Sequence, residues 1–565
     1  MNHIFLTNDY LRRNRAMAIP TAYYEPALHG YVMPDHPTPR TALVALKLLP
    51  ELAVTHPELV AIRDKFIQDI KPVDYAAHYP TRLRAPNVRK LLAAEGMHYW
   101  DFQEGDLGYL GAILRRHSAA YLGWERGLGK TLGAISLIEE LNPERVLILS
   151  SNTAKTAVWA PELARWGKGW MAPVRAVPNG NTARVHSKGD RDQFVDWMWE
   201  HRREPQVNLI HYQALDIIRK TRAGGRGWKR LGTWDLIIAD EFHHFSNKKT
   251  RMTQALKSIP AQMKLGVSGS IISNHASELY SQLNWLFPAR YHAEDRDWNE
   301  RFLDWVDLEG HREYIGVRLD RVDALRDELG RFLTYRRKTD ELDLPPILIQ
   351  DLPVTLGARQ RRVYEDLERD AIAQLDSGEV LTAAHGGALL TRLRMVATGL
   401  NLVSGELTDS AKLDAAVDLI QDNPDEGFVV FSYFVGAAEA LARRLESLGI
   451  KTFTIHEGVK NADRTDFINR FQAGEGRVFV GTLGTLGESV TLSRAANVLF
   501  LDRSWNPQLN DQAVDRVAGG FRALQVGRPI TVSNLVAVDT VDESKISPVL
   551  SSKAAVRAVI LGGRT

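Results

Sequence analysis

The residues best suited to chemistry form a glycine-rich loop that ends in lysine and threonine, Gly127-Leu128-Gly129-Lys130-Thr131. The strand-like run Ala119–Trp124 precedes this loop and the helix-like run Leu132–Leu141 follows it. Glycines let backbone N–H groups turn toward phosphate oxygens, and a helix start adds positive potential for an anion. Lys130 would then contact the β- and γ-phosphates of a nucleotide, and Thr131 would bind Mg²⁺. The loop therefore predicts a nucleotide phosphate site.

The loop departs from the strict pattern G-x-x-x-x-G-K-[ST], because Trp124 stands where the first glycine should be. The shorter form G-x-G-K-T, found in helicase-like motors, does fit. The alternative is a glycine-rich turn between a strand and a helix with a chance Lys-Thr pair. A partner motif decides against this alternative.

That partner is an apolar run that ends in two carboxylates, Leu236–Asp240 followed by Glu241. Asp240 would hold Mg²⁺, directly or through water, and Glu241 would polarise the attacking water as a general base. The alternative is a strand capped by acids at the surface. His243 or His244 could couple the nucleotide site to lobe movement, and an ordinary surface or structural role fits them equally well. We do not interpret them as zinc ligands, because no further ligand set is evident.

Composition limits the class of protein. Hydrophobic residues make up 44% and charged residues 25% of the 565 residues, which is the balance of a soluble globular protein. The net charge is only +2, so a nucleic-acid surface must be a local patch. The absence of cysteine excludes disulfides and cysteine nucleophiles and is compatible with a reducing cytoplasm. No secretory signal is evident, and no apolar stretch approaches the ~20 residues that cross a bilayer. We expect no membrane association and a cytoplasmic location, or a nucleoid or nuclear one.

Apolar runs alternate with helical periodicity in two sets, which is typical of parallel β-sheets with helical crossovers. The predicted strands are Ala119–Trp124, Val146–Ser150, Val207–Tyr212, Leu236–Asp240 and Lys264–Ser268 in the first set, and Phe428–Phe431, Thr452–Ile455, Val478–Val480, Val498–Leu501 and Ile530–Val536 in the second. We predict an α/β fold of two doubly wound parallel-sheet lobes. Residues 1–94 would form an accessory segment, 95–345 lobe one with a helical insertion at about 275–340, and 346–565 lobe two with a helical insertion at about 355–400 and a C-terminal tail.

With these two motifs the chain resembles helicase superfamily two, and further motifs narrow the resemblance to Swi/Snf-like DNA translocases. Ser268-Gly269-Ser270-Ile271-Ile272-Ser273-Asn274 is similar to the family's coupling motif Ser-Gly-Thr-Pro-Ile-x-Asn. The lobe-two motifs of the family are matched by Gly481–Leu492, Asp502–Gln508 and Gln512–Arg516. The resemblance implies two RecA-like lobes, ATP and Mg²⁺ as cofactors, coupling through Ser268, Gly269 and Ser270, and Gly487 at the ATP site.

Gln103 occupies the position at which such motors read adenine through a glutamine amide. ATP would then be the nucleotide, although any exposed glutamine on a helix would look the same. Arg516 matches the arginine of the final motif, but Gly519 stands where the family has a second arginine that reaches the γ-phosphate. Either Arg522 takes this finger role, which we favour, or the finger is absent and hydrolysis is slow. An arginine finger can contribute ~10³–10⁵ in turnover.

DNA contacts are expected to be to phosphates and largely independent of sequence. Candidates follow strand ends in both lobes: Ser151, Asn152, Ser432, Thr482, Trp505 and Asn506. Hydroxyl residues there are also ordinary helix N-caps, and Trp505 could instead pack inside its lobe. The basic stretch Arg219–Arg230 could contact DNA, with Trp228 stacking or wedging, or could be a solvated loop.

The predicted function is an ATP-dependent double-stranded DNA translocase. A strand-separating helicase, a motor acting on single-stranded DNA or RNA, and a weakly hydrolysing nucleic-acid-binding scaffold remain alternatives. Retention of Lys130, Asp240, Glu241 and Arg516 argues against the scaffold. The biological pathway stays open.

Overall fold

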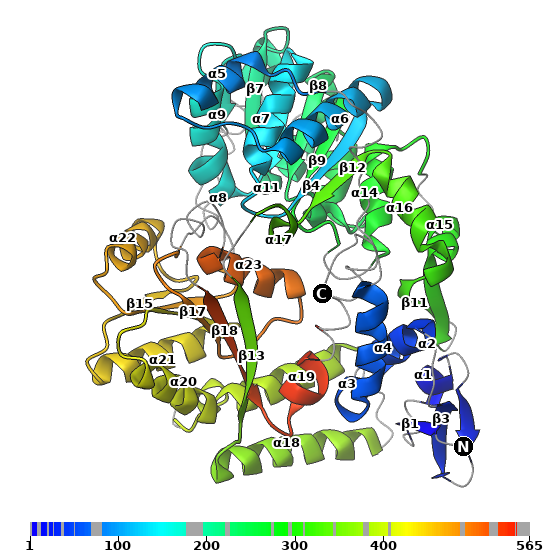
Figure 1. Cartoon of the computed structure of the whole chain (residues 1–565), viewed down its shortest axis with the longest axis vertical. Helices are drawn as coiled ribbons and strands as arrows, with labels where there is room; N and C mark the ends of the chain where they lie inside the picture. Colours follow the sequence, from blue (N-terminus) through cyan, green and yellow to red (C-terminus); the bar gives the residue numbers. More distant parts are fainter. Residues whose placement is uncertain are drawn as a thin grey trace.

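The computed structural model describes most of the chain in three parts, an N-terminal unit and two lobes (Figure 1). The described residues are 3–7, 13–17, 19, 22–25, 28–34, 39–49, 51–68, 82–176, 196–220, 227–272, 276–291, 296–308, 311–342, 346–376, 383–404, 408–485, 492–518, 529–547 and 550. Among them, no helix has the length and apolar character needed to span a membrane.

Lobe one is built on a seven-stranded parallel sheet in the order β12-β4-β9-β8-β5-β7-β6. Its strands are β4 (Ala119–Trp124), β5 (Arg145–Ser150), β6 (Val174–Ala176), β7 (Gln206–His211), β8 (Trp234–Asp240), β9 (Ala261–Val267) and β12 (Leu333–Arg336). The helices between and around them are α5 (Pro86–Ala94), α6 (Asp101–His117), α7 (Lys130–Leu141), α8 (Asn152–Ala154), η4 (Lys155–Trp159), α9 (Ala160–Trp166), α11 (Tyr212–Lys220), α12 (Gly227–Arg230), η5 (Phe242–Phe245) and α13 (Arg251–Lys257).

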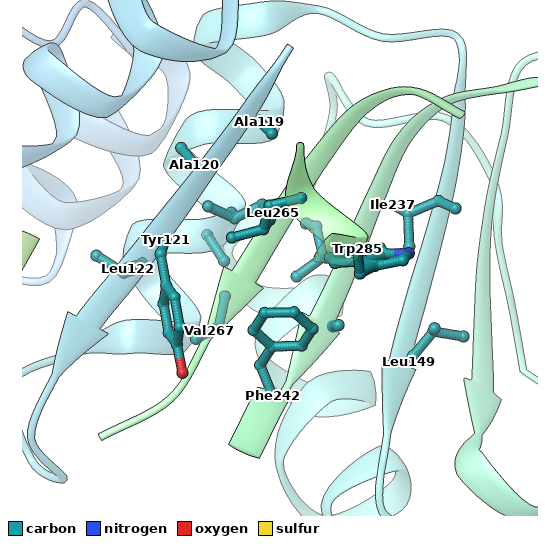
Figure 2. Close-up of a cluster of buried hydrophobic side chains, with 14 of the residues drawn as sticks. Ala119, Ala120, Tyr121, Leu122, Leu149, Ile237, Phe242, Leu265, Val267 and Trp285 are labelled. Carbon is teal, nitrogen blue, oxygen red and sulfur yellow. The ribbon is translucent and has the colours of Figure 1, made fainter. Parts of the chain in front are cut away.

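The core of lobe one lies on both faces of this sheet, because its central strands carry apolar residues toward helices on either side. Every residue of β4 is buried, as are four consecutive residues of β8. Figure 2 shows Phe242, which follows β8, between Tyr121 of β4 and Trp285 of α14 (Glu278–Leu286). Their ring centroids lie 5.3 and 4.9 Å from that of Phe242. This aromatic packing fixes the chain immediately beyond the acidic end of β8.

The insertion of lobe one combines helices with a hairpin that the sequence analysis did not predict. It contains α14 (Glu278–Leu286), α15 (Arg296–Phe302), the antiparallel pair β10 (Leu303–Leu308) and β11 (His311–Val317), η6 (Leu319–Arg321) and α16 (Val322–Gly330). The chain then returns through β12 and α17 (Lys338–Glu341) toward lobe two. The two strands of the hairpin do not alternate strictly between apolar and charged residues, so their sequence pattern does not distinguish them from a charged helix.

The N-terminal unit is a small antiparallel sheet with helices on it. It comprises β1 (His3–Thr7), α1 (Arg13–Met17), β2 (Tyr23–Glu25), β3 (Gly30–Pro34), α2 (Pro39–Leu48), α3 (Leu52–Thr55) and α4 (Pro57–Gln68), with strand order β1-β3-β2. It has its own core, and α2 packs against β11 of the insertion. The helix α5 belongs elsewhere, since Val88 and Leu92 are buried in the core of lobe one. The packing unit of lobe one thus begins before residue 94.

Lobe two is a six-stranded parallel sheet in the order β13-β18-β17-β14-β16-β15. Its strands are β13 (Ile347–Val354), β14 (Phe428–Ser432), β15 (Thr452–Ile455), β16 (Val478–Thr482), β17 (Asn497–Phe500) and β18 (Ile530–Ala537). Its helices are α18 (Ala358–Asp376), α19 (Ala383–Thr398), η7 (Leu400–Leu402), α20 (Ala411–Asp422), α21 (Val435–Ser447), α22 (Asn461–Gln472), α23 (Pro507–Ala518) and η8 (Asp542–Ile546). The two parallel-sheet lobes confirm the predicted fold class.

All ten predicted strands are present, with ends displaced by at most three residues. Within the two parallel sheets, the strands that the sequence did not predict are β6, β12 and β13. The strands β6 and β12 have only three and four residues, and β13 is an exposed edge strand without polar–apolar alternation. Figure 1 shows α17 and α23 at the junction of the lobes, where the candidate site lies.

Candidate nucleotide site between the two lobes

The glycine-rich loop joins β4 to α7 in the sheet-to-helix geometry that suits phosphate binding. Gly127 and Gly129 have φ of 88° and 83°, in the left-handed region that favours glycine. Gly129 is the N-cap of α7 and Lys130 is the first residue of that helix. A Cβ at Gly269 of the coupling motif would lie 3.2 Å from Lys130 Nζ, so glycine there leaves room for the lysine. The structure thus brings the loop and the coupling motif together.

Gln103 lies on α6 directly beneath this loop. Its side chain is buried, and its Nε2 donates to the carbonyl of Leu128 at 2.9 Å. Its Oε1 accepts the N–H of Trp100 at 3.0 Å. Gln103 therefore stabilises the phosphate loop through this hydrogen bond. Recognition of adenine by its amide stays a prediction.

Trp124, which replaces the first glycine of the strict pattern, is part of a buried polar network. Its Nε1 donates to Asp106 Oδ2 at 2.8 Å. Arg336, at the end of β12, donates to both carboxylate oxygens of Asp106, at 2.8 and 3.0 Å. Asp106 is fully buried, so its charge depends on these donors. Trp124 therefore anchors the start of the loop to the segment that leads toward lobe two.

Asp240 ends β8 beside the phosphate loop, and Glu241 follows it. Asp240 Oδ1 accepts the N–H of Glu241 at 2.9 Å, and Oδ2 accepts the indole N–H of Trp159 at 2.7 Å. Glu241 has a φ of 43°, a left-handed conformation that is strained for a residue with a side chain. Such strain costs about 1–3 kcal/mol and is found at functional sites, because surrounding structure must enforce it. The aromatic packing of Phe242 supplies that constraint.

The pKa values of these two carboxylates are shifted in opposite directions. Burial raises the pKa of Asp240, and the neighbouring charge of Glu241 raises it further. Burial would also raise the pKa of Glu241, but the positive charges of Arg126 and Lys130 outweigh it and lower that pKa. Arg126 Nη2 lies 3.1 Å from Glu241 Oε1. Burial lowers the pKa of Lys130. Glu241 is thus held ionised, as a base must be.

His243 connects the acidic strand end with lobe two. It is buried, and burial lowers its pKa to about 3, so the ring is neutral at pH 7. Gln508 Nε2, on α23, donates to His243 Nε2 at 2.5 Å. The ring hydrogen then lies on Nδ1, which donates to Ser268 Oγ at 2.8 Å. Ser268 Oγ in turn donates to the carbonyl of Ser270 at 3.1 Å. One hydrogen-bonded chain therefore runs from lobe two into the coupling motif.

The face of α23 that meets lobe one also carries the predicted arginine. Gln508, Asp515 and Arg516 are spaced by seven and eight residues, which places them on one face of a helix. Asp515 forms an ion pair with Lys338 of α17, whose backbone N–H donates to Glu125 Oε2 at 3.0 Å. Arg516 is thus held on the lobe-two helix that faces the nucleotide site. Arg522, Gly519 and Gly487 lie outside the described residues, so the choice of finger stays a prediction.

The six predicted DNA contacts fall into three pairs, of which two lie at or just beyond strand ends of the two sheets. Ser151 and Asn152 are half-buried beyond β5, where Ser151 Oγ caps α8 by accepting from Ala154 N at 3.1 Å. The hydroxyls of Ser432 and Thr482 are buried and bonded within lobe two, to Asp502 at 2.7 Å and to Thr485 at 2.8 Å. These two side chains organise their loops and do not offer a hydroxyl to DNA in this arrangement.

The remaining two candidates lie at the start of α23. Asn506 Oδ1 accepts the N–H of Gln508 at 3.1 Å, which makes Asn506 a helix cap. Trp505 is half-buried with the Arg394 guanidinium 5.7 Å from its ring centroid, and the same guanidinium lies 4.9 Å from the Tyr433 ring. These positions leave the DNA roles of Trp505 and Asn506 as predictions.

The interpretation of Trp228 as a base-stacking or wedging residue is wrong. Its side chain is 1% exposed, and its Nε1 donates to the carbonyl of Leu215 at 3.0 Å. Trp228 therefore packs α12 onto α11. Residues 221–226 of the basic stretch lie outside the described residues.

Sequence reasoning missed several contacts that build this site. Trp159 binds Asp240 across 81 residues of sequence, and Lys338 meets Asp515 across 177. His243 was a candidate coupling residue, and its partner Gln508 was not anticipated. Of the contact residues that were missed, only Trp159 gave a signal in the sequence, because it is a large aromatic residue. That signal does not distinguish a residue of the site from one that packs in an ordinary core.

The donor set of the site fits Mg²⁺ and a nucleotide. Left-handed glycines, a helix start and Lys130 suit phosphate groups. The carboxylate of Asp240 and the hydroxyl of Thr131 are oxygen ligands of the kind Mg²⁺ prefers. Thr131 is half-buried in the first turn of α7.

Two parallel-sheet lobes, with a phosphate loop and acidic strand end facing an arginine-bearing helix, define the class of helicase-like two-lobed proteins. Comparison with known families narrows the class. Residues 102–397 match the SNF2-related domain and residues 411–519 match the helicase conserved C-terminal domain. The chain belongs to the SNF2-related family.

Individual relatives are distant and longer. The chain is 24% identical over 469 residues to the SWI/SNF-related matrix-associated actin-dependent regulator of chromatin subfamily A member 1 of Mus musculus, covering 78% of this chain and 42% of that protein. It is 25% identical over 499 residues to the putative ATP-dependent helicase/translocase YwqA of Bacillus subtilis (strain 168), covering 82% and 50%. With the ISWI chromatin-remodeling complex ATPase ISW1 of Saccharomyces cerevisiae, it shares 26% over 475 residues, covering 78% and 39%. The chain spans half or less of the length of these relatives.

Among solved structures, the chain is similar to the Sulfolobus solfataricus SWI2/SNF2 ATPase core in complex with dsDNA. The match has 18% sequence identity and a TM-score of 0.35, and it covers 79% of this chain and 89% of that one.

Proposed function

We propose that the chain is an ATP-dependent double-stranded DNA translocase that couples ATP hydrolysis to movement along DNA or its remodelling. The contact of Gln508 with His243 carries this proposal, because it joins lobe two to the residue beside the acidic pair. A change at the nucleotide can therefore alter the relation between the lobes. The names of the relatives, an ATP-dependent helicase/translocase and two chromatin regulators, support the same activity.

In this function each residue of the site has a defined task. The phosphate loop and Lys130 bind the nucleotide phosphates, and Thr131 and Asp240 hold Mg²⁺. Bound Mg²⁺ neutralises the charge that develops on the phosphate oxygens. Glu241, kept ionised by Arg126, orients the attacking water and accepts its proton. Arg516 of lobe two stabilises the transferring phosphate group when the lobes close.

Closure would also couple DNA with ATP. The candidate DNA loops follow strand ends in both lobes, so a DNA backbone held by both favours one relation between them. The same arrangement of the lobes brings Gln508 of α23 into contact with His243, which is hydrogen-bonded to Ser268 of the coupling motif. ATP and DNA that favour one closed state must raise each other's affinity.

The test is ATP turnover with and without blunt duplex DNA. We expect stimulation by the duplex in the unaltered protein and loss of turnover in Lys130→Ala and in Glu241→Gln. Glu446→Gln, an exposed glutamate on α21, is the matched charge control and should keep full turnover. No stimulation by any nucleic acid would refute a motor function.

The same assay separates the related activities. Greater stimulation by RNA or single-stranded DNA than by duplex DNA would indicate that the motor acts on that nucleic acid instead of on duplex DNA. A strand-displacement assay on forked DNA distinguishes helicase activity from translocation. Turnover of Arg516→Ala and Arg522→Ala assigns the finger, and full activity of Arg522→Ala would exclude that residue.

A further inference from the structure

Trp159 is a buried tryptophan whose indole N–H reaches the acidic end of β8. It is fully buried, and its Nε1 donates to Asp240 Oδ2 at 2.7 Å. A tryptophan that only filled space would have no need to place its single polar atom on a carboxylate proposed to hold Mg²⁺.

The local backbone shows how the indole reaches this position. Trp159 is the last residue of η4, a π-helical turn between α8 and α9. π-Helical turns are rare and occur frequently at functional sites, because the wider turn redirects side chains from the regular helical positions. Here the turn places the indole over the end of β8, while α9 continues in ordinary α geometry.

The remaining contacts of Asp240 show that its carboxylate is fixed from two sides. Oδ1 accepts the N–H of Glu241 at 2.9 Å, and Oδ2 accepts the indole. The backbone carbonyl of Asp240 also accepts the hydroxyl of Tyr212. With one donor on each oxygen, the plane of the carboxylate is set, and each oxygen retains a lone pair for a metal ion or its water.

We propose that Trp159 is a positioning residue that holds the Asp240 carboxylate in the orientation required to bind Mg²⁺ with the nucleotide. This inference rests on the proposed function, because it takes Asp240 as the residue that holds the metal ion. Hydrogen bonds to a ligating carboxylate orient it, and their loss typically lowers metal affinity or activity by ~10–100-fold. Trp159 itself does not touch nucleotide or metal.

The chain offers a closely matched control seven residues further on. Trp166 of α9 is also buried, 2% exposed, and its Nε1 donates to Glu162 Oε2 at 2.6 Å. Trp166→Phe therefore removes an indole-to-carboxylate hydrogen bond of the same kind from the helix that follows η4, away from Asp240. A general effect of shrinking a buried tryptophan would be equal in the two variants.

The experiment measures nucleotide affinity without DNA and without turnover. ADP binding is titrated calorimetrically in Mg²⁺ and in EDTA, and the ratio of the two dissociation constants gives the gain due to Mg²⁺. We expect Trp159→Phe to reduce this gain about tenfold, while Trp166→Phe leaves it unchanged. ADP affinity in EDTA should be the same in all three proteins, because the phosphate loop is intact.

Two outcomes overturn the inference. One is a folded Trp159→Phe protein with the gain of the unaltered chain, and the other is an equal reduction in both variants. If Trp159→Phe fails to fold, 3-benzothienylalanine at position 159 replaces it, since this analogue keeps the ring shape and lacks the N–H. An unaltered protein with no gain from Mg²⁺ would overturn the proposed function together with this inference, whereas a normal gain that Trp159→Phe retains would overturn the inference alone.

Discussion

Replacing Gln508 with alanine should weaken the coupling between the lobes without altering any residue proposed to bind nucleotide. Gln508 is 3% exposed, and its amide donates to the Nε2 of buried His243 at 2.5 Å. Truncation leaves that ring nitrogen buried without this donor, at a cost of about 1–3 kcal/mol. A coupling free energy of this size corresponds to a change of about 5–150-fold in the relevant equilibrium. The closed arrangement of the lobes should be disfavoured by that factor.

The assay compares DNA-stimulated and basal ATP turnover in a double-mutant cycle of Gln508→Ala and His243→Ala. We expect Gln508→Ala to reduce the stimulated rate at least fivefold and to weaken ATP binding as well, because ATP favours the same closed state. Gln350→Ala is the control, because it truncates a glutamine of lobe two whose Nε2 donates to Ser533 Oγ at 2.9 Å, within that lobe. The cycle should give an interaction free energy of about 0.5–3 kcal/mol, as for residues in direct contact.

Additive effects would refute this reasoning. If the double variant loses the sum of the two single losses, the hydrogen bond between Gln508 and His243 does not transmit the effect of DNA. Equal loss in Gln350→Ala would show a general destabilisation of lobe two.

Three further predictions follow from charges in and around the site. Lys338→Met removes the ion pair with Asp515 and should lower DNA-stimulated turnover at low and at high salt alike, because salt screens a largely buried pair only weakly. Asp106→Ala leaves the Arg336 guanidinium with Glu341 but without Asp106, and leaves the buried Trp124 indole without its acceptor, so it should lower the free energy of unfolding in urea by about 1–3 kcal/mol. Burial raises the folded-state pKa of Asp240 to about 6, above its unfolded value, so ionising it opposes folding once pH rises through that range. Without Mg²⁺, Asp240→Asn should therefore raise the urea midpoint at pH 7.5, with a smaller gain at pH 5.

The strand pattern was readable because each central strand is buried on both faces and therefore appears as a continuous apolar run. The short edge strand β6 lacks this signal, since all three of its residues are exposed. The hairpin of β10 and β11 was missed because its strands lack strict polar–apolar alternation and its stability comes from pairing between the strands and from packing against α2. Local sequence does not contain those partners.

By itself, the sequence determined the phosphate loop, the acidic strand end and the family. These features are local, since a glycine-rich turn and an apolar run ending in Asp240 and Glu241 are set by adjacent residues. Tertiary structure decided how they are joined. Packing between distant segments placed the Trp159 indole within hydrogen-bonding distance of Asp240 and the Gln508 amide within hydrogen-bonding distance of His243. It also buried the hydroxyl of Ser432, a residue that the sequence pattern had suggested as a DNA contact. A side chain's partner depends on which segments the fold brings together, and spacing along the chain does not specify that.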